Sequence, residues 1–68
     1  MIVAVNGTAT ELPDGATIAG VLAELKVPSG ARGVAVAVQG EVVPRTEWVA
    51  MSLRDGDRIE IVQAIQGG

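Results

Sequence analysis

The stretch Arg58-Ile59-Glu60-Ile61-Val62 near the end of the chain alternates apolar and charged residues, as a β-strand with one buried face does. Ile59 and Ile61 take the inward positions, and Arg58 and Glu60 take the outward positions. Further along, the outward positions become apolar at Val62 and Ala64. The pattern therefore predicts a strand that completes a sheet and exposes an apolar docking surface at its far end.

Two hairpins are predicted upstream of this strand. Asn6-Gly7 separates two strand-like runs, and Asn-Gly favours a type I′ turn because both central residues of that turn need positive φ. Gln39-Gly40 separates a second pair, although Gln adopts positive φ less readily than Asn, so this turn is expected to be strained or of another type. The four strands are expected at residues 2–5, 8–12, 34–38 and 41–43.

One amphipathic helix is predicted between the hairpins. Thr17 can cap its first turn, and four apolar residues from Ile18 to Leu25 follow the i, i+3, i+4, i+7 spacing of a single buried face. Residues 45–51 are expected to form a short helical turn that lays Trp48 on the core. The predicted core consists of Val3, Val5, Ile18, Val21, Leu22, Leu25, Val36, Val38, Trp48, Leu53, Ile59 and Ile61.

The order of these elements is strand, strand, helix, strand, strand, short turn, strand. This order predicts an α+β fold of the β-grasp, ubiquitin-like type, in which a mixed five-stranded sheet packs on one main helix and the first and last strands pair in parallel. Residues 1–64 are expected to form the domain. Residues 65–68, Ile65-Gln66-Gly67-Gly68, are expected to form a flexible tail that reaches about 13 to 14 Å when extended.

The composition argues against several classes of protein. The net charge is −3, there is one aromatic residue, and Lys and Arg do not cluster, which argues against nucleic-acid binding. The chain has no Cys and no His, so it lacks the usual nucleophile, general base and zinc ligands, and we predict neither a catalytic residue nor a metal site. Asp55-Gly56-Asp57 is interpreted as a turn. No apolar run is long enough for a membrane span, and we expect a cytoplasmic protein.

The group that can carry chemistry is the carboxyl group of Gly68. At neutral pH a terminal carboxylate is an anion and a poor electrophile, so it needs activation, for example by ATP-dependent adenylation. Gly67 and Gly68 have no Cβ, so they can enter a narrow channel and leave the acyl carbon open to attack. The catalytic groups would then belong to partner enzymes.

Several segments together resemble the sulfur carrier family of bacterial thiamine biosynthesis. They are Asn6-Gly7, residues 34–38, Val43-Pro44-Arg45-Thr46-Glu47-Trp48, Asp55-Gly56-Asp57, residues 59–62 and Gly67-Gly68. The resemblance implies that Gly68 is adenylated by an adenylyltransferase similar to ubiquitin-activating enzymes and becomes a thiocarboxylate that gives sulfur to thiazole synthase. It also implies that the chain binds no cofactor, that partner enzymes use ATP and a sulfur donor such as a cysteine desulfurase, and that the free carrier is a monomer.

The same resemblance assigns roles to the residues around Gly68. Gly67 gives access, and the docking contacts are expected from Ala4, Val62, Ala64, Ile65 and Gln66. Three alternatives stay open at this point: the small subunit of molybdopterin synthase, a modifier conjugated to other proteins, and a β-grasp interaction module that is never activated.

Overall fold

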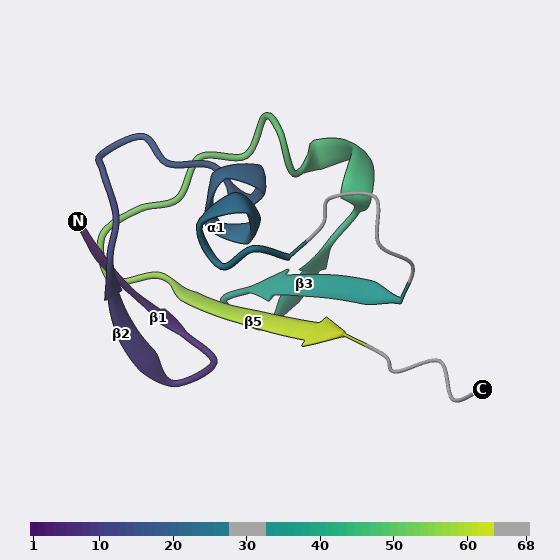
Figure 1. The fold of residues 1–68 in the computed structure, drawn as a ribbon, viewed down its shortest axis with the longest axis horizontal. Coiled ribbons are helices and arrows are strands. Elements are labelled where there is room, and N and C mark those ends of the chain that lie inside the picture. Colours follow the sequence, from purple (N-terminus) through teal and green to yellow (C-terminus); the bar gives the residue numbers. More distant parts are fainter. Residues whose placement is uncertain (28–32, 64–68) are drawn as a thin grey trace.

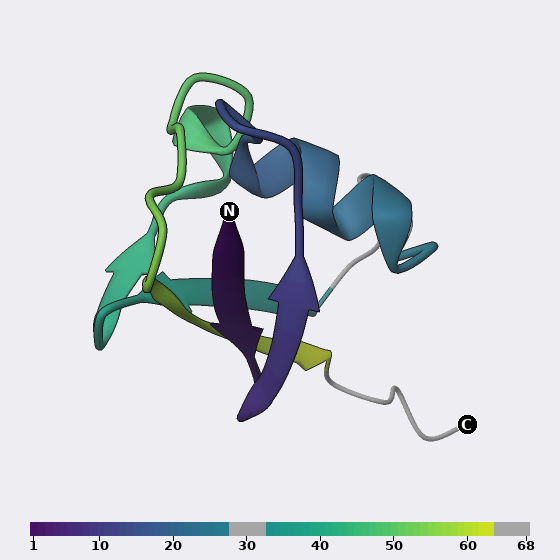
Figure 2. The same cartoon turned by 90° about the vertical axis from the view of Figure 1, so that its left-hand side faces the viewer.

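The computed structural model describes residues 1–27 and 33–63, and the elements in these ranges follow the predicted order (Figure 1). They are β1 (Ile2–Val5), β2 (Thr8–Glu11), α1 (Ile18–Glu24), β3 (Val34–Val38), β4 (Glu41–Val43), the 3-10 helix η1 (Arg45–Glu47) and β5 (Arg58–Gln63). The strands form one sheet in the order β2-β1-β5-β3-β4, and α1 lies across one face of it (Figure 2). The predicted β-grasp fold is therefore confirmed.

β5 is the central strand, and its two neighbours pair with it over different lengths. β1 runs parallel to β5, and the end of β1 pairs only with the start of β5, with Ala4 opposite Arg58 and Val5 opposite Ile59. β3 runs antiparallel and pairs with β5 as far as Gln63. The last residues of β5 therefore have a strand on one side alone.

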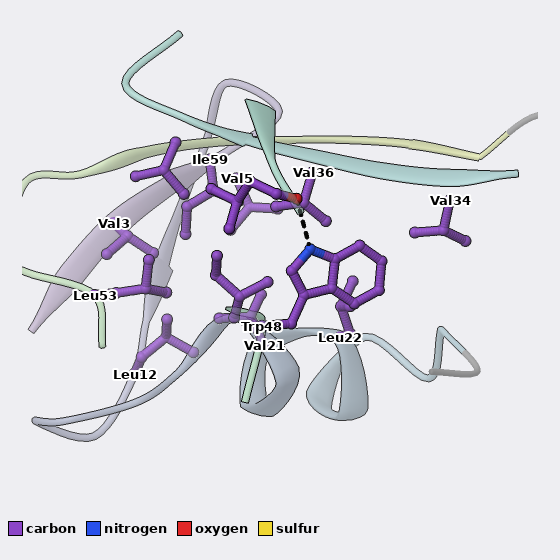
Figure 3. Close-up of a cluster of buried hydrophobic side chains, with 13 residues drawn as sticks. Val3, Val5, Leu12, Val21, Leu22, Val34, Val36, Trp48, Leu53 and Ile59 are labelled. Atoms are coloured by element: carbon purple, nitrogen blue, oxygen red, sulfur yellow. Dashed lines mark hydrogen bonds between the residues drawn. The ribbon is translucent and has the colours of Figure 1, made fainter. Parts of the chain in front are cut away.

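The core lies between α1 and the sheet (Figure 3). Ile18, Val21 and Leu22 of α1 are at most 1% exposed, and Val36 and Ile59 of the sheet are equally buried. Three further core residues were not in the predicted set, namely Leu12, Val34 and Val43.

Two predicted core residues need comment. The prediction for Leu25 is wrong, because α1 ends at Glu24 and Leu25 is its C-cap, with a side chain that is 44% exposed. Lys26 follows with φ 59, a left-handed conformation that ends the helix and turns the chain away. Ile61 is only partly buried and packs against the edge of the core.

The segment from Val43 to Trp48 connects β4 to α1 through hydrogen bonds of Trp48. Trp48 is buried, and its indole Nε1–H donates a hydrogen bond of 3.0 Å to the carbonyl oxygen of Val43. The carbonyl oxygen of Trp48 accepts from the backbone N–H of Ala19 at 3.0 Å, in the first turn of α1. The Arg45 guanidinium lies 5.0 Å from the centre of the indole ring. The motif therefore joins the end of β4 to the helix.

The Asn6-Gly7 turn has the predicted conformation, and the Gln39-Gly40 turn, expected to be strained or of another type, has the same pattern of positive φ. Asn6 and Gly7 have φ 49 and 84, and Gln39 and Gly40 have φ 52 and 83, so both turns have two residues with positive φ. Gln39 thus adopts the disfavoured conformation, and its side-chain Oε1 accepts a 2.7 Å hydrogen bond from the Arg58 N–H. This bond offsets part of the cost of positive φ in Gln.

Candidate functional site

Among the described residues no helix covers the second face of the sheet, and we call it the outer face. Successive residues of a strand point to opposite faces, so the neighbours of the buried strand residues point outward. On β1, β3, β4 and β5 these outward residues are Ile2, Ala4, Ala35, Ala37, Val42, Arg58, Glu60 and Val62. On β2, Ala9 and Glu11 pair with Ala4 and Ile2 and share this face. Its centre and its β3-β4 side are therefore mainly apolar, and its charged residues are Glu11 on β2 and Arg58 and Glu60 on β5.

Val62 lies on this face, as the sequence predicts. Its side chain is 62% exposed, and it pairs with Ala35 on β3. Ala37 on the same strand pairs with Val42 of β4, which is 75% exposed. We call these four residues the valine-alanine patch; it borders the end of β5, from which the chain continues to Gly68.

Sequence reasoning missed most of this patch. The alternation of Val and Ala in residues 34–38 already places Ala35 and Ala37 on the outward positions. What it does not give is the register, which sets Ala35 opposite Val62 and Val42 opposite Ala37.

Ala4 lies on the same face but away from Val62. It pairs with Arg58, which is four residues before Val62 on β5, a separation of about 13 Å along a strand. Glu60 points outward between them. Ala4 instead lines an open pocket of about 420 Å³ together with Asn6, Gly7, Arg58, Ile59 and Glu60. A contact of Ala4 with the same partner as Val62 stays a prediction.

The side chain of Asn6 reaches β5 at the rim of this pocket. Its Oδ1 accepts a hydrogen bond of 2.8 Å from the Ile61 N–H, and its Nδ2 donates one of 3.2 Å to the Ile61 carbonyl oxygen. No sequence pattern within the first hairpin indicates this contact, because its partners are 55 residues apart.

The remaining predicted site residues, Ala64, Ile65, Gln66, Gly67 and Gly68, lie outside the described residues. The last described residue, Gln63, pairs with Val34 at the end of the β3 ladder. The roles assigned to these five residues, and the boundary between domain and tail, stay predictions.

Asp55 and Asp57 accept backbone hydrogen bonds around the turn before β5. Asp55 Oδ1 accepts from the Ile2 N–H at 2.7 Å, and Asp57 Oδ2 accepts from the Arg54 N–H at 2.8 Å, so this pair shapes the loop before β5. In residues 1–27 and 33–63 no group of three or more His, Cys, Asp or Glu side chains is arranged to hold a metal ion. No helix in these ranges has the length and apolar character needed to cross a membrane.

Comparison with known proteins gives one family and a small set of relatives. Residues 2–68 match the model of the ThiS family. The sulfur carrier protein ThiS of Escherichia coli is 42% identical over 36 residues, which are 53% of this chain and 54% of that protein. A thiazole synthase of Paramagnetospirillum magneticum is 37% identical over all 68 residues, which correspond to 20% of its length. The chain thus spans a fifth of one curated relative, and its match covers about half of the other.

Two solved structures have the same fold. The crystal structure of a thiamine biosynthesis protein (ThiS) from Geobacter metallireducens has a TM-score of 0.82 and 31% identity, with complete coverage of both chains. The solution structure of a thiamine biosynthesis protein from the same organism has a TM-score of 0.81 and covers this chain completely and 88% of that chain.

Proposed function

The chain belongs to the ThiS family, and we propose that it is a sulfur carrier of thiamine biosynthesis that acts through the carboxyl group of Gly68. The observation that carries this proposal is the family match over residues 2–68, because it includes both Gly67 and Gly68. The 31% identity to the Geobacter ThiS structure over the full length of both chains supports it.

The proposed chemistry has two steps at Gly68. In the first, a carboxylate oxygen attacks the α-phosphorus of ATP, pyrophosphate leaves, and an acyl adenylate forms. In the second, a sulfide equivalent attacks the acyl carbon, AMP leaves, and a thiocarboxylate results. An adenylyltransferase similar to ubiquitin-activating enzymes would catalyse the first step. The sulfide equivalent would come from a cysteine desulfurase, whose persulfide a thiol reductant would reduce, or from another donor. A Gly at position 68 keeps the acyl carbon accessible in both steps.

The outer face is the proposed docking surface for these enzymes. Exposed apolar side chains gathered on one face are typical of interaction sites, and the valine-alanine patch lies at the end of β5 that leads to Gly68. The contacts proposed from the sequence are those of Ala4, Val62, Ala64, Ile65 and Gln66; the structure adds Ala35, Ala37 and Val42 as candidates.

A thiazole synthase is the proposed acceptor of the sulfur. The relative from Paramagnetospirillum magneticum bears that name, and a fifth of it matches all 68 residues of this chain. A domain of this kind therefore occurs inside a chain named thiazole synthase, which supports a direct contact between carrier and synthase.

The proposal is tested by intact-protein mass spectrometry after incubation with ATP, a ThiS adenylyltransferase and a sulfide donor. We expect one oxygen to be replaced by sulfur at Gly68, only when ATP is present, and no change in a variant that lacks Gly68. An unmodified Gly68, under conditions that convert the Escherichia coli sulfur carrier, would rule out the proposed chemistry.

Growth tests separate the pathways. The chain should restore thiamine-independent growth to a strain that lacks its own ThiS, and it should not restore a strain that lacks the small subunit of molybdopterin synthase. The reverse pattern would assign the chain to the second pathway.

A further inference from the structure

β5 loses its partner on the β1 side before it ends. Pairing with β1 stops at Val5 opposite Ile59, because the chain turns at Asn6 and Gly7. In a sheet, a central strand directs its N–H and C=O groups to both neighbours, alternating along its length. After Ile59, the next residue of β5 that faces β1 is Ile61, and no strand residue of β1 remains to pair with it.

The side-chain amide of Asn6 takes the place of that missing residue. The backbone N–H of Asn6 donates to the Ile59 carbonyl oxygen at 2.8 Å, which is the last backbone hydrogen bond of this ladder. Beyond it, Oδ1 accepts from the Ile61 N–H at 2.8 Å and Nδ2 donates to the Ile61 carbonyl oxygen at 3.2 Å. A carboxamide offers an acceptor and a donor as a peptide group does. The Asn6 side chain therefore extends the hydrogen bonding between β1 and β5 by one peptide unit.

This contact is separate from the role of Asn6 in its turn. The turn requires positive φ at position 6, and Gly meets that requirement at least as well as Asn. Only a side-chain amide can also bond to Ile61. Replacement of Asn6 by Gly therefore removes the contact with β5 and keeps the turn.

The second hairpin turn provides a matched control. Gln39 also has positive φ, and its side-chain Oε1 accepts from the N–H of Arg58 at 2.7 Å. Each turn thus contributes a side-chain amide to β5. Gln39 holds the first residue of the strand, and Asn6 holds Ile61 near its end.

We propose that Asn6 is a positioning residue for sulfur transfer: by holding Ile61 it sets the direction in which the chain leaves the sheet toward Gly68. This inference rests on the proposed function. Ile61 precedes Val62, whose pairing with Ala35 on β3 sets the register of the valine-alanine patch, so Asn6 holds β5 from the opposite side next to that pair. A partner that binds the outer face then meets the end of β5 in one orientation, and less orientational freedom is lost on docking.

The test compares Asn6→Gly with Gln39→Gly in ATP-dependent pyrophosphate exchange with a ThiS adenylyltransferase. For Asn6→Gly we expect kcat/KM for the carrier to fall by about three- to tenfold, with kcat within about twofold, because the partner's channel fixes the chain once docking is complete. For Gln39→Gly we expect kcat/KM to stay within about twofold of wild type.

Amide hydrogen exchange supplies an independent readout. In Asn6→Gly the protection of the Ile61 amide should fall by about tenfold, whereas in Gln39→Gly the Arg58 amide should lose protection instead. If Ile61 loses protection in Asn6→Gly and kcat/KM does not change, Asn6 has no positioning role. An equal fall of kcat/KM in both variants would assign the effect to the stability of the sheet and would also overturn the inference.

A second variant covers the case in which Asn6→Gly does not fold. Asn6→Asp keeps a residue that tolerates positive φ and keeps the acceptor for the Ile61 N–H, but it sets an oxygen against the Ile61 carbonyl. It should lower kcat/KM in the same direction, and a wild-type value would contradict the inference. If the wild-type chain gave no pyrophosphate exchange, the proposed function would fail together with the role of Asn6. Hydrogen exchange of the Ile61 amide would still report whether the contact with Asn6 exists.

Discussion

Both faces of the sheet carry valine side chains, but these are buried on the inner face and exposed on the outer face. On the inner face, Val3, Val36 and Ile59 are each 1% exposed under α1. On the outer face, Val42 and Val62 are 75% and 62% exposed, although they belong to the same strands as buried residues. A valine in this sheet therefore contributes to stability or remains available for contact according to its parity alone. We expect substitutions on the two faces to separate stability from docking.

The largest effect is expected on the inner face, at Leu22. Its side chain is fully buried, so Leu22→Ala should lower the free energy of unfolding by about 2–5 kcal/mol through lost burial and a cavity. Urea denaturation measures this change. A loss below about 1 kcal/mol would show that α1 does not pack on the sheet as described.

The next effect is expected on the outer face, at Val62. Val62→Glu should raise KM for the carrier about tenfold in the adenylation reaction, because it places a charge in the valine-alanine patch. The free energy of unfolding should change by less than about 0.5 kcal/mol.

Val49→Glu is the matched control for this variant. Val49 is 76% exposed but lies in the turn after η1, away from the outer face, so its KM should equal that of wild type. An equal rise of KM in both variants would mean that added negative charge, and not the outer face, controls docking.

A smaller effect is expected at the start of α1. The Thr17 hydroxyl accepts a hydrogen bond of 3.1 Å from the Gly20 N–H, so it caps a helix of seven residues. Thr17→Ala should cost about 1 kcal/mol of unfolding free energy, whereas Thr17→Ser should retain most of it. If the free energy of unfolding of both variants matched that of wild type, the packing of α1 on the inner face would not depend on this cap.

The smallest effect is expected at Leu25, which sequence reasoning placed in the core. Because the side chain is 44% exposed, Leu25→Ala should cost about 1 kcal/mol or less, well below Leu22→Ala in the same helical stripe. Equal losses in urea denaturation would mean that both leucines are buried in solution.

These residues show how far local patterns reach. The strands, the places of the two turns and the buried face of α1 follow from periods of 2 and 3.6 and from the turn residues Asn-Gly and Gln-Gly, which are local properties. The error at Leu25 arose at a helix end, where the period continues but the helix does not. Leu12 and Val43 were missed because Leu12 follows the end of β2 and Val43 is the last residue of the three-residue β4, so the alternation around each is too short to indicate burial.

From the sequence alone came the outward position of Val62 and the prediction that Gly68 carries the chemistry, because strand parity and a missing Cβ are properties of the residues themselves. The tertiary structure decided which residues surround Val62, and it showed that Asn6 holds Ile61 and that Gln39 holds Arg58. These contacts join residues 19 to 55 positions apart. They depend on the register of the strands, which is set when the whole core packs.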